Sequence, residues 1–168
     1  MKRTQFFVVL VVLAFSATAA LAQVGLKPEL VLTLSVQKEV IVTGEGGKPK
    51  TEWQEVQSTG PGDVLKYTIR YENKGKVEAR DAKIVDPVPQ NTSYIGDSAE
   101  GEGAEINFSL DGKTFQPAPM LKYRIRMADG SEVEYVATPD MYTHIQWKLK
   151  KPVPPGGTGS VSFKVKVQ

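Results

Sequence analysis

The sequence of 168 residues contains no cysteine and only one histidine, His144. The lack of cysteine excludes disulfide bridges, cysteine-based metal sites and cysteine nucleophiles. Asp140 lies close to His144 in the sequence, but no Gly-x-Ser-x-Gly motif accompanies the pair. We therefore interpret His144 as a solvated or capped residue at the start of a strand. We expect no catalytic residues and no enzymatic activity.

The chain also lacks an excess of charge of either sign once its first residues are set aside. It has 21 basic and 19 acidic residues, and two of the basic ones, Lys2 and Arg3, belong to the N-terminal leader. The remaining chain is formally neutral. Its charge balance therefore gives no reason to expect nucleic acid or an anionic membrane surface as a partner.

The first 22 residues have the pattern of a secretory signal peptide. Lys2 and Arg3 precede an uncharged apolar run, Phe6–Ala14, and Ala20-Leu21-Ala22 places small residues where a signal peptidase reads them. The apolar run is shorter than the roughly 20 residues that span a membrane. We predict cleavage after Ala22, export to the periplasm, cell surface or extracellular space, and no stable membrane insertion afterwards. Residues 23–168 are then expected to form one domain.

No convincing helical period occurs in that domain, and alternation of apolar and polar residues dominates it instead. In Pro61–Gly75, Leu65, Tyr67, Ile69 and Tyr71 alternate with polar residues, between turn residues at both ends. We interpret this stretch as a central strand. The same period predicts further strands at Glu29–Val42, Glu78–Val85, Glu105–Leu110, Leu121–Met127, His144–Leu149 and Ser160–Val167.

Many short strands separated by Gly/Pro turns predict an all-β, antiparallel sandwich or barrel. Within it, Val40–Gln57 is interpreted as an inserted N-terminal hairpin. Matching apolar faces in a second hairpin predicts Met127 opposite Val133 and Ile125 opposite Tyr135. The residues expected to be most buried are Tyr67, Ile69, Ile125, Trp147 and Phe163.

Three segments together resemble a known bacterial and archaeal surface repeat. They are Gly62–Ile69, Glu72–Gly75 and Asp81–Pro89, and the ending with Trp147, Pro155-Gly156 and Ser160–Val167 is also similar. The family is the conserved-repeat domain of unknown function number eleven, an immunoglobulin-like sandwich. The resemblance implies a non-enzymatic module of the cell surface or envelope. Unlike many members, this chain has one copy and carries the inserted hairpin.

Two groups of residues are candidate sites. Asp97, Glu100, Glu102 and Glu105 lie in a Gly-rich loop, and carboxylates on flexible loops suit calcium, although a solvated acidic loop explains them as well. No other cofactor is expected. The second group is an assembly strand, Leu30, Leu32, Leu34 and Val36, which share one face near the N-terminus of the mature chain. This strand either pairs within its own domain or is donated to another subunit.

These observations favour an exported structural or interaction module whose partners are copies of itself or other envelope proteins. Strand addition between subunits would make filaments. The alternative is a monomeric β-sandwich that binds carbohydrate or a protein. Surface aromatics such as Trp53 and Tyr142 suit sugar binding, but either of them suits the core equally well.

Overall fold

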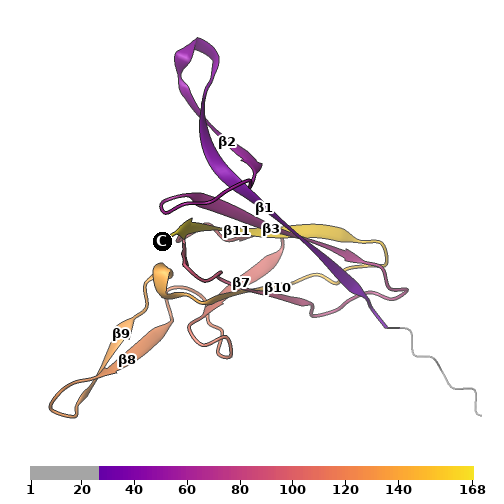
Figure 1. Cartoon of the computed structure of the whole chain (residues 1–168). Helices are drawn as coiled ribbons and strands as arrows, with labels where there is room; N and C mark the ends of the chain where they lie inside the picture. The colour runs from indigo at the N-terminus through magenta and orange to yellow at the C-terminus, as the bar shows by residue number, and fades with distance from the viewer. Residues whose placement is uncertain (1–26) are drawn as a thin grey trace, which may run out of the picture.

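The computed structural model describes residues 27–168, and the predicted signal peptide lies outside this range. Within it, the chain consists of strands and two single turns of 3-10 helix, η1 (Glu45–Gly47) and η2 (Pro139–Met141). The prediction of an all-β, antiparallel fold is therefore confirmed for these residues. Two hairpins project from the body of the molecule in different directions (Figure 1).

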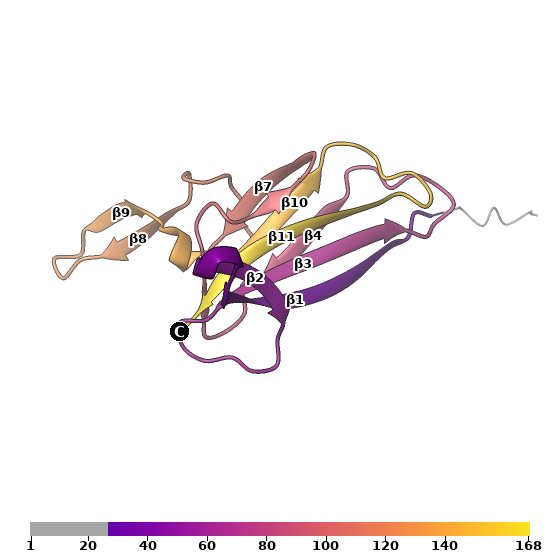
Figure 2. The ribbon, with the colours of Figure 1, turned by 90° about the horizontal axis from the view of Figure 1, so that it is seen from above.

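The larger sheet has Pro61–Gly75 near its centre, as the alternation predicts. Its strand order is β2-β1-β3-β11-β5, with β6 also paired to β11, and every pair is antiparallel. These strands are β1 (Leu30–Thr43), β2 (Pro49–Glu55), β3 (Val64–Asn73), β5 (Thr92–Tyr94), β6 (Glu100–Gly101) and β11 (Thr158–Val167). Seen from above, β1 lies at the outer side of the sheet, next to β3 (Figure 2).

The smaller sheet has the order β4-β10-β7. Its strands are β4 (Lys83–Pro87), β7 (Ala104–Ser109) and β10 (His144–Leu149). Residues of both sheets meet in one apolar core, where the Trp147 ring of β10 and the Phe163 ring of β11 lie 6.0 Å apart. The Trp147 indole N–H, which burial would otherwise leave without a partner, donates to the Glu100 carbonyl at 3.1 Å.

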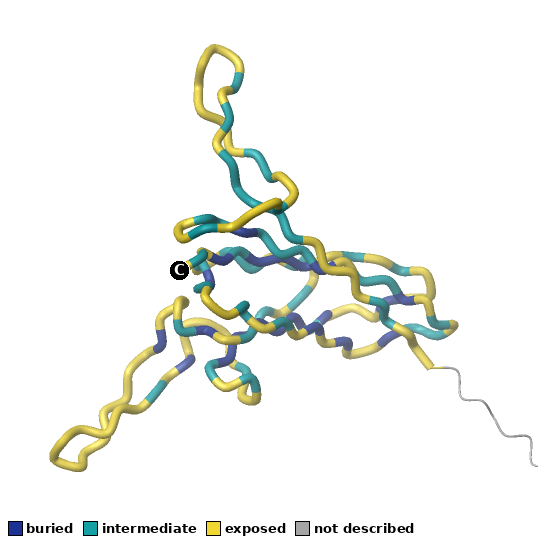
Figure 3. Tube along the Cα trace, in the orientation of Figure 1, coloured by how far each residue is buried: buried dark blue, intermediate teal, exposed yellow. Residues whose placement is uncertain are grey.

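Three of the five residues expected to be the most buried are confirmed as buried, and a fourth, Tyr67, is only half-buried at the edge of the core. Ile69, Trp147 and Phe163 are buried, and Tyr67 is half-buried and stacks on Phe163 with ring centroids 5.2 Å apart. The prediction for Ile125 is wrong, because this residue is 43% exposed. Ile125 belongs to a third sheet, the hairpin of β8 (Lys122–Arg126) and β9 (Glu132–Val136), which extends beyond the core and is largely exposed (Figure 3).

The predicted register of this hairpin is also wrong, by two residues. Ile125 lies opposite Val133 and Tyr123 opposite Tyr135. Gly130 adopts φ +86°, and the Met127 amide donates to the Ser131 carbonyl at 2.8 Å. The three-residue loop is therefore 128–130 rather than 129–131. A shift of two residues keeps every side chain on its own face, so alternation alone does not exclude it.

One buried asparagine joins three segments at the end of β3. The side-chain amide of Asn73 donates to the carbonyls of Val77 and Val153, both at 2.8 Å. Its side-chain oxygen accepts from the amides of Gly75 at 3.0 Å and Glu29 at 3.3 Å. All the side-chain hydrogen-bonding capacity of Asn73 is thus used within the protein, as a fully buried amide requires.

Candidate functional site

The four acidic residues of the predicted calcium loop do not form a cluster. Among residues 27–168, no group of three or more His, Asp or Glu side chains is placed to hold one metal ion. Glu105 instead pairs with Lys148 at 3.2 Å and accepts from Asn107 at 2.9 Å, and these contacts lower its pKa. Glu100 accepts from the Ser162 hydroxyl at 3.3 Å. The calcium hypothesis therefore gains no geometric support.

His144 begins β10, as expected from the sequence. Its Nδ1 lies 2.9 Å from the Thr143 hydroxyl, and its ring packs against Gly112, where an added Cβ would lie 2.7 Å from the imidazole. Asp86, on the neighbouring strand β4, is half-buried, and burial raises the pKa of its carboxyl, although the charge of His144 partly opposes this effect. Within the described residues, no carboxylate is hydrogen-bonded to His144. The imidazole ring and the Thr143 hydroxyl therefore do not belong to a nucleophile–base–acid chain.

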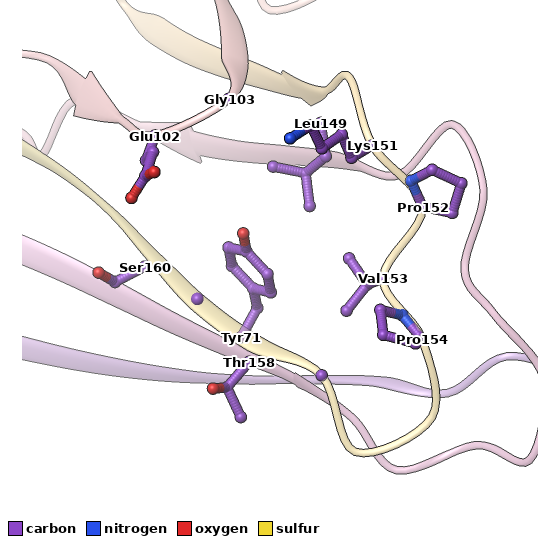
Figure 4. A pocket seen from close by; sticks show the side chains of 12 residues that line it. Tyr71, Glu102, Gly103, Leu149, Lys151, Pro152, Val153, Pro154, Thr158 and Ser160 are labelled. Atoms are coloured by element: carbon purple, nitrogen blue, oxygen red, sulfur yellow. The ribbon is translucent and has the colours of Figure 1, made fainter.

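A pocket of about 400 Å³ opens at the end of the molecule near Asn73. It is lined by Tyr71 of β3, by Leu149 at the end of β10 and by Pro152, Val153, Pro154 and Gly157 of the following loop. Glu102, Lys151, Thr158 and Ser160 add polar groups to the lining (Figure 4). Tyr71 lies opposite Gly159 of β11, and an added Cβ at Gly159 would overlap the phenol ring. Glycine at this position therefore allows the ring to lie across β11 and form one wall of the pocket.

The pocket combines an aromatic wall with a few polar groups, an arrangement typical of small-ligand sites. Sequence reasoning did not find it, because its walls come from segments that are far apart in the chain. The Pro155-Gly156 turn was the only local signal in this region.

Trp53 of β2 and Tyr142, the two aromatics considered for sugar binding, have different environments. Tyr142 is buried in the core against Tyr94 and Phe108. The Trp53 ring lies 5.3 Å from the Lys164 ammonium and 6.0 Å from that of Lys66, each measured to the ring centroid. These cation–π contacts hold Trp53 against the solvent face of the larger sheet.

The β8–β9 hairpin is amphipathic, and its apolar face is only partly covered. Tyr123 and Tyr135 stack across the strands with ring centroids 5.6 Å apart, and Ile125 and Val133 follow toward the tip. The opposite face carries ion pairs from Glu134 to Lys122 at 2.7 Å and to Arg124 at 3.4 Å. Exposed pairs of this kind contribute little stability.

The predicted assembly strand is the first half of β1, and it pairs within its own chain. Leu30–Lys38 lie antiparallel to β3, with Leu34 opposite Ile69. Val36 packs against the core around Trp147, and Leu30 packs against a second, smaller apolar cluster that includes Leu149 and Val153. Leu32 and Leu34, in contrast, are 51% and 53% exposed. The smaller sheet covers the buried part of β3 but does not extend over these two leucines.

None of the helical turns within residues 27–168 has the length and apolar character needed to cross a membrane. Comparison of the chain with known proteins found no matching family model, no matching curated protein and no matching solved structure.

Proposed function

We propose that this protein is an exported, non-catalytic immunoglobulin-like β-sandwich with a structural or interaction role in the cell envelope or the extracellular space, and that it associates with copies of itself. The resemblance of Gly62–Ile69 and Asp81–Pro89 to a bacterial and archaeal surface repeat supports the fold and the location. The packing of two antiparallel sheets around Trp147 and Phe163 is consistent with such a sandwich.

The observation that carries the proposal is the amount of apolar surface left uncovered on strands. Leu32 and Leu34 on β1, and Ile125 and Val133 on the projecting hairpin, are all at least one-third exposed. Solitary exposed apolar residues are ordinary, but neighbouring ones on a strand mark surfaces that bind a partner. No arrangement of catalytic groups competes with this interpretation within residues 27–168.

The test is the size of the exported protein in solution, measured by light scattering over a wide concentration range. Self-association predicts a mass that rises with concentration above that of one chain. A single-chain mass at every concentration, in the absence of any other protein, would contradict the self-assembling role.

The second candidate is a monomeric binding module, and the pocket beside Tyr71 favours it. Its aromatic wall and the hydroxyls of Thr158 and Ser160 suit a carbohydrate. Titration with a panel of soluble oligosaccharides, followed by tyrosine and tryptophan fluorescence, tests this function. Binding should be lost in Tyr71→Ala and retained in Trp53→Ala if the pocket is the site.

A further inference from the structure

The first half of β1 has one strand edge without a partner among the described residues. β1 pairs with β3 over Leu30–Lys38, but β2 begins to pair on the other side only at Gln37. The edge along Leu30–Val36 therefore faces outward, as Figure 2 shows for the outer side of the sheet.

The hydrogen-bonding groups on this edge follow from the pairing with β3. The Lys74 amide donates to the Glu29 carbonyl at 2.8 Å, so Glu29 points its backbone groups toward β3. In an antiparallel pair, this orientation alternates along the strand. The even-numbered residues Leu30, Leu32, Leu34 and Val36 therefore direct their N–H and C=O groups outward, away from β3.

The side chains along the same edge are unusual for an exposed position. Leu30–Val36 reads LVLTLSV and contains no charged residue, glycine or proline. Proteins normally protect such edges with lysine, proline or a bulge, because an uncharged apolar edge pairs with other strands. Here Leu32 and Leu34, both about half exposed, stand on this edge without that protection.

We propose that a second copy of this chain covers the edge, with Val31–Ser35 of the two copies paired antiparallel about a two-fold axis at Thr33. This inference rests on the proposed self-association and names the surface responsible. The register places Leu32 beside Leu34 of the partner copy. Glu55 of β2 lies opposite Gln37 on the same side of β1, so the pairing ends before Val36, and the two Leu32–Leu34 pairs give about four new backbone hydrogen bonds.

Three features select a second copy as the occupant. A two-fold contact requires a surface that is complementary to itself, and LVLTLSV is nearly symmetric about its threonine. The segment carries no charge, so pairing it with itself brings no like charges together. Finally, β2 blocks the edge from Gln37 onward, which limits the contact to the segment centred on Thr33. A contact this small is expected to be weak and to depend on concentration.

Because the chain has no cysteine, single introduced cysteines report the register directly. At a self-paired, non-hydrogen-bonded position the two Cα atoms lie about 4.5 Å apart, within the roughly 4.4–6.8 Å range of disulfides. Thr33→Cys should therefore form a disulfide-linked dimer under mild oxidation. The control is Ile41→Cys, on the same strand and 77% exposed but beside β2, which should give only background cross-linking. Equal cross-linking of the two variants would overturn the proposal.

A second pair of variants tests the contact without oxidation. Leu34→Lys should reduce the mass measured by light scattering to that of one chain, while Ile41→Lys, which loses a more exposed apolar side chain, should leave it unchanged. Circular dichroism and thermal unfolding verify that both variants fold.

The outcomes distinguish the surfaces. If wild type associates and Leu34→Lys associates equally well, the β1 edge is not the interface, although self-association stands. If Tyr135→Lys alone abolishes association, the hairpin is the interface. If wild type is monomeric throughout, the proposed self-association itself fails.

Discussion

Replacing Asn73 with alanine removes a side chain that ties the end of β3 to three other segments. The variant leaves the carbonyls of Val77 and Val153 and the amides of Gly75 and Glu29 without their present partner. The backbone bonds of residue 73 itself, to Gly156 and Gly157, are unaffected. The expected loss therefore comes from the side chain alone.

The magnitude follows from the four bonds and their exposure. A typical hydrogen bond contributes about 0.5–1.5 kcal/mol net, so four bonds give roughly 2–6 kcal/mol. Only the bond to Val153 is fully buried, and water replaces part of the others, so we expect about 3 kcal/mol. For a domain near 150 residues, each kcal/mol shifts Tm by about 2–4 °C. Differential scanning calorimetry should therefore show a Tm lower by about 6–12 °C.

The control is Lys76→Ala, an exposed residue of the adjoining turn, which should change the free energy of unfolding by less than about 0.5 kcal/mol. Asn73→Asp is informative as well, because it keeps the acceptor for Gly75 and Glu29 but sets a carboxylate against two carbonyl oxygens. It should be less stable at pH 7 than at pH 4. If Asn73→Ala costs no more than Lys76→Ala, the asparagine does not hold this end of the sheet together.

Three further changes test the core, the pocket and the buried carboxyl. Ile69→Ala should lower the free energy of unfolding by about 2–5 kcal/mol in urea denaturation, and a loss under about 0.5 kcal/mol would show that the site is not buried. Gly159→Ala should displace the Tyr71 ring and cost about 1–3 kcal/mol, whereas a wild-type Tm would mean that the ring is free to move. Burial raises the pKa of Asp86 above its unfolded value of roughly 3.9, so the folded state binds more protons and wild-type stability falls as pH rises through this window. Asp86→Asn should therefore be more stable than wild type at pH 7 and gain nothing at pH 3, and a gain that is the same at both pH values would refute the assignment.

The sequence predicts strands well here because one face of most strands meets a core. Alternation located β3 and β11 and identified Ile69 and Phe163 as core residues. The same alternation failed for Ile125, because it shows which side chains share a face and not whether another sheet covers that face. The outcome depends on where the smaller sheet ends, and no local pattern encodes that boundary.

The candidate sites were harder to predict than the strands. Asn73 looked like an ordinary turn residue, since its buried partner Val153 is 80 positions away in the chain. The acidic loop suggested calcium by composition, yet Glu105 pairs with Lys148 across two strands. The partners of both Asn73 and Glu105 lie on segments that are distant in the sequence. A single sequence carries little information about such contacts.

The position of β11 has a consequence for how the chain reaches its folded state. This strand is the last along the described residues, yet it pairs with β3 on one side and with β5 and β6 on the other. The larger sheet therefore cannot close until Thr158–Val167 has been synthesised, and folding that relies on such distant contacts is slow. Until Thr158–Val167 has been synthesised, the edges of β3, β5 and β6 that pair with β11 therefore stay open in the nascent chain.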